Sequence, residues 1–543
     1  MQAALPLVAP VSRRASNGDP QRAMGAYYTP TTAADYMADW VVRGSGEHIF
    51  EPSVGDGSFL RAVTASAARR DLTKPLLSGA EIDPFMLAGA VVEGLLGSVN
   101  AHEGDFLALP PFPVTAVIGN PPFVRLRHLP TDERDRALAA AEAVMGQGMD
   151  PAGSVWLPFL LHAMRFLIPG GRLAFVLPYE ATYVRYARPL WQVIGAQFGS
   201  LRVIRTHERL FGDLYQDVVL LLADDYGKHT ATVHYQVYER IADLLADRAA
   251  IETAITISDL TQGKRAFIAA LLSEELRTLL ATRLDSLTSP ARERVTWNIG
   301  YVSGDKEFFH PSANTIAAYG LPGSSLRQSV TSARALRGAG LYTHAAPSSA
   351  TEQLFLPDRV RLAEGERRYL AWGEQQGVAN RYKCRVRTPW YVTPDTRIPD
   401  VVLSVFSERP VLLVNDGDCL ASNSLLCGFL RVGTVSELAA SWYTSLTLLQ
   451  CELEVHALGG GVMVLIPGET GRIRLPQRVE AATDHLDHLD RLLRAGETAS
   501  AYQAGDQAVL MAQLQLSEHE VELIRHGVEV LAHWRTSARS SKR

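Results

Sequence analysis

Four consecutive residues, Asn120-Pro121-Pro122-Phe123, carry the clearest chemical signal in the sequence. They follow a short apolar run at 116–119 that predicts a buried parallel strand. The Asn120 side-chain oxygen and the Pro121 carbonyl can both accept hydrogen bonds from one planar NH2 group, which draws the nitrogen lone pair toward an incoming methyl group. The prolines stiffen the loop, and Phe123 offers a flat face for a base. This pattern favours methylation of an amino group, although Asn and Pro also occur in ordinary turns.

Acidic residues and glycines at the ends of earlier strands predict a ligand pocket. In Phe50-Glu51-Pro52-Ser53-Val54-Gly55-Asp56-Gly57, a strand ends at Glu51, and the glycines let a ligand approach the backbone. An acid before the turn suits an amino or hydroxyl group better than a phosphate, and neither GxGxxG nor a Walker loop is present. Glu81 in Glu81-Ile82-Asp83 is placed to bind ribose hydroxyls, with helix capping as the alternative. Asp105 could accept from an adenine amino group, and Phe106 could pack on its ring.

Strands and helices alternate regularly through the first 225 residues. We expect further strands at 173–177, 201–204 and 218–222, and a helix that opens at 150–153 and ends at Pro169-Gly170-Gly171. The alternation predicts an α/β fold, a Rossmann-like doubly wound methyltransferase sheet that is mainly parallel and covered on both faces. Ligands of such sheets bind at the carboxyl ends of the strands, where Gly55, Glu81, Asp105 and Asn120 all fall.

Composition and charge exclude several classes of protein. The 543 residues are 47% hydrophobic and 20% charged, with a net charge of −5, so a nucleic-acid partner would need a local basic face. No apolar run reaches the roughly 18 residues of a membrane span, and the N-terminus lacks the basic cluster and apolar core of a signal peptide. The four cysteines show no CxxC spacing, so we expect no metal site. The expected location is cytoplasmic.

The second half of the sequence differs in character from the first. We predict a flexible tail at 1–24, a catalytic domain at 25–240, a mixed α+β region at 241–478 and a C-terminal helical segment at 479–543. The most informative feature of the second half is a run in which every second residue is basic. On a strand these basic residues would share one face and form a basic stripe. Such a stripe suits phosphates, although a charged, solvated edge strand is the alternative. The stripe and its flanking aromatic residue are Arg381, Lys383, Arg385, Arg387 and Trp390.

Taken in order, these motifs resemble the TaqI-like, gamma-ordered adenine-N6 DNA methyltransferases of restriction–modification systems, which use S-adenosylmethionine. The matching pieces are Tyr28-Thr29-Pro30, Phe50-Glu51-Pro52 with Gly55-Asp56-Gly57, Glu81-Ile82-Asp83-Pro84, Asp105-Phe106, Asn120-Pro121-Pro122-Phe123, Phe159 ahead of Leu167-Ile168-Pro169-Gly170-Gly171, and Leu210-Phe211 ahead of Asp217-Val218-Val219-Leu220. The resemblance covers residues 25–225 well and the second half only loosely.

The resemblance implies a role for each matching residue. The catalytic residues would be Asn120, Pro121, Pro122 and Phe123. The residues that bind S-adenosyl-L-methionine would be Tyr28, Thr29, Pro30, Glu51, Pro52, Ser53, Gly55, Gly57, Glu81, Ile82, Asp105, Phe106, Asn120 and Phe159. Phe123 and Phe211 would stack on a flipped-out adenine, and 241–478 would be a DNA target-recognition region that contacts double-stranded DNA through Arg381, Lys383, Arg385, Arg387 and Trp390.

The sequence therefore predicts a site-specific adenine-N6 DNA methyltransferase, the modification component of a restriction–modification or phage-defence system. A separate restriction endonuclease or defence-system subunit stays open as a partner, and no membrane partner is expected. Because Asn-Pro-Pro-Phe recognises an NH2 group and not one molecule, an RNA or protein-glutamine methyltransferase and a cytosine-N4 DNA methyltransferase remain alternatives. The region of about 300 residues after the catalytic domain argues against RNA and protein substrates.

Overall fold

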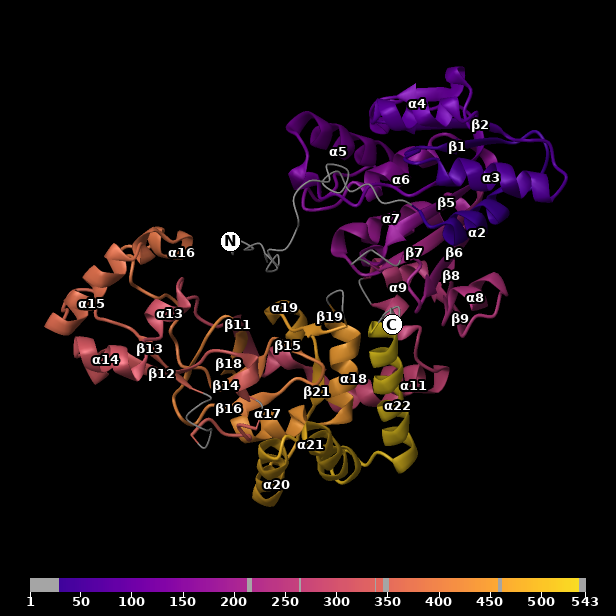
Figure 1. Ribbon diagram of the computed structural model, residues 1–543. Coiled ribbons are helices and arrows are strands. Elements are labelled where there is room, and N and C mark those ends of the chain that lie inside the picture. The colour runs from indigo at the N-terminus through magenta and orange to yellow at the C-terminus, as the bar shows by residue number, and fades with distance from the viewer. Residues whose placement is uncertain are drawn as a thin grey trace. The chain divides into compact units, whose positions relative to one another are not determined.

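The chain folds into two compact units. The computed structural model describes residues 29–211, 217–262, 265–336, 338–344, 351–457 and 461–536. Within these ranges the first unit ends at Phe267 and the second begins at Ile268 (Figure 1). The first unit thus extends past the expected boundary at 240, because β9 (Ile251–Thr256) pairs along its whole length with β8 (Thr232–Tyr238).

The first unit is built on a nine-stranded sheet with the order β3-β2-β1-β4-β5-β7-β6-β8-β9. Strands β3, β2, β1, β4 and β5 are parallel, whereas β7 runs antiparallel to both of its neighbours. The remaining bounds are β1 (His48–Glu51), β2 (Leu76–Glu81), β3 (Ala101–Glu103), β4 (Val114–Gly119), β5 (Leu167–Pro178), β6 (Phe198–Thr206) and β7 (Val218–Tyr226). The predicted Rossmann-like α/β sheet is confirmed.

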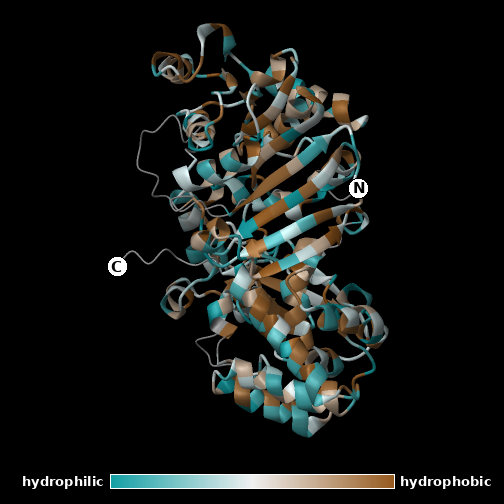
Figure 2. Ribbon diagram, turned by 90° about the vertical axis from the view of Figure 1, so that its right-hand side faces the viewer, coloured by the Kyte–Doolittle hydropathy of each residue, from teal (hydrophilic) through white to brown (hydrophobic). Residues whose placement is uncertain are grey.

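The apolar strands make the central core of this unit. Four consecutive residues at the end of β4 and the last eight of β5 are buried, as expected of strands covered on both faces, and Figure 2 shows brown, hydrophobic stretches along the strands. The main covering helices are α2 (Thr31–Val41), α3 (Ser58–Arg69), α4 (Pro84–Val92), α5 (Thr131–Met145), α6 (Trp156–Met164) and α7 (Arg188–Gly195).

The sequence Pro169-Gly170-Gly171 does not end a helix as predicted. Helix α6 already ends at Met164, and the three residues lie inside β5. There the pairing with β4 shifts, because Leu167 pairs with Val114 whereas Arg172 pairs with Ala116. The extra residues form a loop in the strand, and Gly170 adopts a φ of 78° that only glycine takes up readily.

The second unit combines small sheets with helices. Its largest sheet has the order β11-β18-β14-β16, formed by β11 (Val295–Ile299), β18 (Leu425–Leu430), β14 (Val401–Ser404) and β16 (Leu412–Val414). A second sheet joins β13 (Glu352–Phe355), β12 (Leu326–Val330) and β17 (Leu420–Ala421). Helices of this unit include α13 (Lys306–Phe309), α14 (Ala313–Tyr319), α15 (Glu364–Gln375), α16 (Tyr382–Arg385), α17 (Val435–Trp442), α18 (Ser445–Glu454) and α20 (Thr483–Arg494).

The C-terminal helices predicted from the sequence are present. Helix α22 (Glu518–Arg535) begins with a capping box between Ser517 and Glu520 and buries Val521, Ile524 and Leu531. It packs on α18 and on α11 (Glu274–Leu279), and Gly527 permits the close approach to α11, because a Cβ there would lie 2.4 Å from Leu276. None of the helices in the described ranges has the length and apolar character needed to cross a membrane.

Candidate active site

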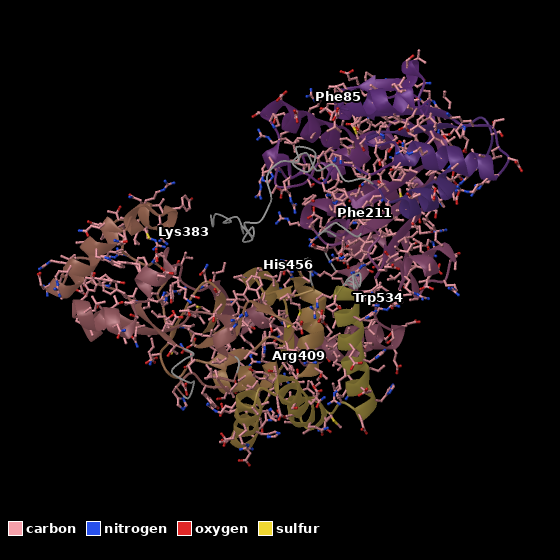
Figure 3. The ribbon with its side chains drawn as sticks, viewed as in Figure 1. Phe85, Phe211, Lys383, Arg409, His456 and Trp534 are labelled. Carbon is pink, nitrogen blue, oxygen red and sulfur yellow. The ribbon has the colours of Figure 1, made fainter. Side chains whose placement is uncertain are left out.

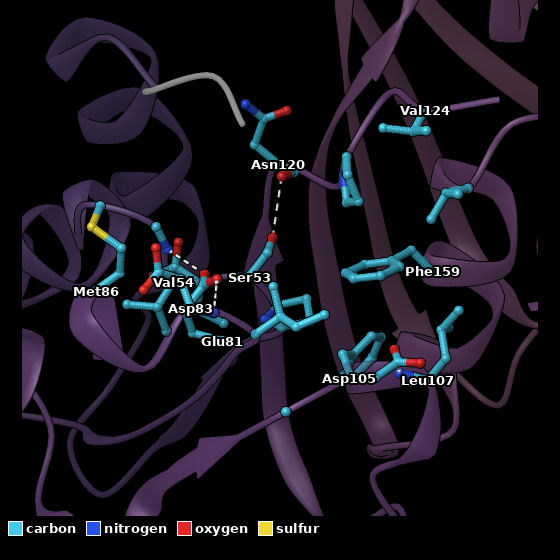
Figure 4. A pocket seen from close by; sticks show the side chains of 18 of the residues that line it. Ser53, Val54, Glu81, Asp83, Met86, Asp105, Leu107, Asn120, Val124 and Phe159 are labelled. Carbon is cyan, nitrogen blue, oxygen red and sulfur yellow. Dashed lines mark hydrogen bonds between the residues drawn. The ribbon is translucent and has the colours of Figure 1, made fainter. Parts of the chain in front are cut away.

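A cavity of about 450 Å³ opens at the carboxyl ends of β1, β2 and β4 (Figure 4). This volume is typical of a small-molecule site, and the place is where the strand order reverses between β1 and β4. Many of the residues predicted to bind a cofactor line it: Thr29, Glu51, Pro52, Ser53, Gly55, Glu81, Ile82, Asp105, Phe106, Asn120 and Phe159.

The glycine turn after β1 is tied to the acid at the end of β2. The backbone N–H of Gly55, with a φ of 51°, donates to Glu81 Oε2 at 2.8 Å, and the N–H of Asp83 donates to Glu81 Oε1 at 3.0 Å. Asp83 itself caps α4 through the N–H of Phe85 at 2.9 Å. Helix capping therefore falls to Asp83, and the Glu81 carboxylate stays at the cavity wall with further lone pairs to offer.

Glu51 is a carboxylate buried in the cavity wall. Glu51 is 2% exposed, and its Oε2 atom has no hydrogen-bond partner among the described residues. Burial raises the pKa of Glu51 well above its ordinary value, and the nearby charges of Asp56 and Glu81 raise it further. A buried acceptor of this kind is costly unless a ligand donates to it, which makes Glu51 suited to an amino group.

Asp105 and the two aromatic rings form another part of the wall. Asp105 Oδ1 accepts from the N–H of Leu107 at 2.9 Å, and Oδ2 accepts from Arg136 Nε on α5 at 2.7 Å. Phe106 is buried, and its ring centroid lies 4.8 Å from that of Phe159, whose ring projects beside the cavity in Figure 4. The ion pair with Arg136 holds the carboxylate of Asp105 in one orientation at the cavity.

Asn120 lies where the loop of residues 120–123, which we call the catalytic loop after its predicted role, meets the glycine turn. Its main-chain carbonyl accepts from Ser53 Oγ at 3.1 Å, and its side-chain nitrogen donates to Thr29 Oγ1 at 3.4 Å. A Cβ on the preceding Gly119 would lie 3.2 Å from the Pro52 ring, so glycine permits the two loops to touch. The amide group is thereby oriented with its nitrogen toward Thr29.

Some predicted residues lie elsewhere. Phe211 belongs to the hydrophobic core of the first unit (Figure 3), and Phe123, half-buried, packs against the same core. Neither ring lines the 450 Å³ cavity, so their stacking on a base stays a prediction. Tyr28 lies outside the described residues. Pro30 precedes α2, and Gly57, with a φ of 77°, precedes α3.

The sequence interpretation missed one whole side of the cavity. His128, Leu129, Pro130 and Glu133, which lead from the catalytic loop into α5, line it together with Met86 and Val124. Their sequence position was the available signal, because His128 follows Phe123 by five residues and the chain cannot travel far from the site over that length.

The predicted basic stripe is not a strand. Residues Tyr382–Arg385 form the short helix α16, so the four cations do not share a face. Arg381 pairs with buried Asp305, and Arg387 donates to the carbonyls of Ser303 and Val302 at 2.7 and 2.6 Å. These bonds fix the ends of α16, and both guanidinium groups therefore bind acceptors within the protein.

Three of the predicted cations are exposed: Arg381, which pairs with Asp305, and Lys383 and Arg385. Lys383, labelled in Figure 3, and Arg385 lie at the surface, each with its charge about 5.5 Å from the ring of exposed Tyr382. Trp390 instead packs 5.4 Å from Phe308 and donates to Glu374 at 3.0 Å. The alternating spacing suggested a strand, whereas the buried side chain of Cys384 anchors a helical turn.

Two protein families match the chain. Residues 15–186 match the family N-6 DNA Methylase, and residues 264–510 match the family Type II methyltransferase M.Eco57I, C-terminal domain. Type II methyltransferase M.XamI of Xanthomonas campestris pv. amaranthicola is 24% identical over 480 residues, covering 83% of this chain and 85% of that protein. Type II methyltransferase M.XhoI of Xanthomonas vasicola is 26% identical over 207 residues, covering 32% and 37%.

Among solved structures, the type IIG restriction endonuclease BpuSI aligns with a TM-score of 0.44 and 14% identity, covering 96% of this chain and 68% of that one. The doubly wound sheet with Asn-Pro-Pro-Phe beside a ligand-sized cavity is the arrangement that the sequence predicts for a methyltransferase. The match of residues 15–186 to the N-6 DNA Methylase family and the similarity to M.XamI support a DNA methyltransferase of restriction–modification type. These matches confirm the predicted resemblance to adenine-N6 DNA methyltransferases of restriction–modification systems.

Proposed function

We propose that the first unit transfers a methyl group from S-adenosyl-L-methionine to the N6 amino group of an adenine flipped out of duplex DNA, at one specific sequence. The observation that carries this proposal is Asn120, which stands at the cavity wall with its amide oriented by Thr29. An acceptor on the catalytic loop beside a cofactor-sized cavity is the arrangement that amino-group methylation requires.

The residues of the cavity fit S-adenosyl-L-methionine. When bound, this cofactor supplies an electrophilic methyl group on a sulfonium. Glu51, whose buried Oε2 atom has no partner among the described residues, would accept from the cofactor's amino group. Glu81 would accept from the ribose hydroxyls, and Asp105 from the adenine amino group. Phe159 would pack against the adenine ring.

The catalytic loop would orient the target nitrogen. Asn120 Oδ1 and the Pro121 carbonyl would accept its two hydrogens and turn its lone pair toward the cofactor side of the cavity. Because the prolines fix the loop before substrate binds, these acceptors need no reorganisation during the reaction. No strong base is needed, because the nitrogen becomes acidic once it is cationic.

The adenine must leave the duplex to reach Asn120, which costs a few kcal/mol, roughly, in lost stacking and pairing. Phe123 and Phe211 would offset part of this cost by stacking on the extruded base. Phe123 directly follows the loop that binds the amino group, so its ring is close enough in sequence to face the same base.

We further propose that the second unit recognises the DNA target. Residues 301–391, which we call the basic lobe, contain twelve Lys and Arg and seven Asp and Glu, a net charge of +5 in a chain of net −5. Its exposed cations include Lys383 and Arg385, held beside Tyr382. This local positive charge suits the phosphates of DNA, and contacts to phosphate would set the position of the protein on the duplex.

The test is modification-sensitive sequencing of DNA from cells that express the chain, with an Asn120→Ala variant beside it. N6-methyladenine at one short motif, absent with the variant, is the expected result. N4-methylcytosine at a motif would instead assign a cytosine-N4 methyltransferase. Unmodified DNA together with transfer of labelled methyl to RNA or protein by the purified chain would overturn the proposal. A separate restriction endonuclease or defence-system subunit is proposed as the partner of this activity.

A further inference from the structure

The segment that follows the catalytic loop is attached to two other parts of the first unit. The Val124 carbonyl accepts from Ser154 Oγ at 2.9 Å and from the N–H of Val155 at 2.9 Å, and the N–H of Leu126 donates to the Gly153 carbonyl at 3.0 Å. These three bonds join the segment to the residues that lead into α6. They leave the side chain of Arg125, between them in sequence, to make a different contact.

Arg125 reaches Glu180, which lies just beyond the end of β5. Its Nη2 atom donates to Glu180 Oε2 at 2.6 Å, and the two side chains are 39% and 11% exposed. The other oxygen of Glu180 accepts from the Tyr186 hydroxyl at 2.7 Å, and that hydroxyl accepts from Trp156 Nε1 at 3.1 Å. Burial and the charge of Glu180 raise the pKa of Tyr186, so its hydroxyl stays a donor.

Glu180 therefore connects three segments of the first unit. It connects the exit of the catalytic loop through Arg125, the start of α7 through Tyr186 and, by way of Tyr186, the start of α6 through Trp156. The entry of the loop is fixed separately, at Asn120 by Ser53 and Thr29. Phe123 lies between these two attachments, without a role in either.

We propose that Glu180 is a positioning residue for methyl transfer, because through Arg125 it fixes the exit of the catalytic loop and so places Phe123 against the target base. This inference rests on the proposed function. Removal of a purely structural contact would lower the stability of the protein and leave kcat of the folded enzyme almost unchanged. A displacement of about 1 Å at a reacting group, in contrast, can lower the rate by roughly 100-fold.

The test compares Arg125→Met and Glu180→Gln with a matched control, Arg43→Met. Arg43 donates two bonds of 3.0 and 2.8 Å to Asp224, and its side chain is 43% exposed, close to the 39% of Arg125. It lies between α2 and β1, at the ends of the strands opposite to the cavity. We expect kcat to fall by about 10- to 100-fold in the two loop variants and to stay unchanged in the control. The Kd for S-adenosyl-L-methionine should stay unchanged in all three.

Two further readouts separate positioning from folding. With 2-aminopurine at the target position, the loop variants should leave the extruded base less stacked and more fluorescent than the wild type does. The double charge reversal Arg125→Glu/Glu180→Arg should recover part of kcat, because it restores an ion pair at the same place. Equal kcat losses in the Arg43→Met control, or unchanged kcat in both loop variants, would overturn the proposal.

Hydrogen exchange measures the attachment independently of activity. Amides of residues 123–126 should exchange faster in Glu180→Gln than in the wild type, with no change in Arg43→Met. Unchanged exchange would show that Glu180 does not hold the loop and would overturn the inference. A wild-type protein that methylates no DNA would refute the proposed function instead, and the exchange rates would still report whether Glu180 holds the loop.

Discussion

Replacing Glu51 by Gln should change stability and cofactor affinity in opposite directions. Glu51 is 2% exposed, and burial together with the charges of Asp56 and Glu81 raises the pKa of its carboxyl well above the ordinary 4.5. The folded protein therefore retains a proton that the unfolded chain releases. Between the ordinary pKa and the raised one, each pH unit costs the folded state about 1.4 kcal/mol.

The protonated, neutral form of Glu51 sets the direction in which stability changes with pH. In the cofactor-free wild type, the contribution of Glu51 to the free energy of unfolding is fully present below pH 4.5. This contribution falls as the pH rises toward the raised pKa of Glu51, and above that pKa it falls no further. Gln has no proton to release, so Glu51→Gln should be more stable than the wild type at pH 8, and the two should converge near pH 5. Urea unfolding of the cofactor-free proteins across this range measures the difference.

The same substitution should weaken cofactor binding. At a pH above the raised pKa of Glu51, where its carboxyl is ionised, a hydrogen bond from this carboxylate to a cationic amino group contributes about 1.5–3 kcal/mol, and its loss corresponds to roughly a 10- to 150-fold higher Kd for S-adenosyl-L-methionine. Isothermal titration calorimetry measures this change. A variant that is less stable at every pH and binds the cofactor with unchanged Kd would refute both the burial argument and the assigned contact.

Three further predictions concern the other parts of the site. Asn120→Ala should abolish methyl transfer and leave the Kd for the cofactor nearly unchanged, and surviving turnover would remove its assigned role. Glu81→Ala should raise that Kd because two ribose contacts are lost, and titration calorimetry at constant pH checks it. Replacing Lys383 and Arg385 together by Ala should weaken DNA binding and reduce its salt slope by about 2, whereas Arg240→Ala, an exposed cation of the first unit, should change neither. An unchanged salt slope in the double variant would place the DNA elsewhere.

The predicted fold and the observed one agree where the signal is local. The apolar runs that end at Glu51, Glu81 and Gly119 each form a buried strand, because such runs bury best inside a sheet covered on both faces. The prediction at Pro169-Gly170-Gly171 was wrong, because Pro and Gly interrupt a strand as readily as they end a helix. Only the pairing partner β4 decides between the two.

The residue types at the ends of the first strands already predict the chemistry of the site. Asn120 and the loop that contains it, the acids at the strand ends and their order along the chain predict a methyltransferase site, because these residue types accept hydrogen bonds wherever a parallel sheet gathers its strand ends. The tertiary structure decided which groups serve that site. It assigned helix capping to Asp83, paired Asp105 with Arg136, bound Arg125 to Glu180 and engaged Arg381 and Arg387 in the fold. The four long-range contacts join residues 31 to 85 positions apart, and the Asp83 cap depends on the local turn that the packing selects, so no spacing in the sequence encodes them.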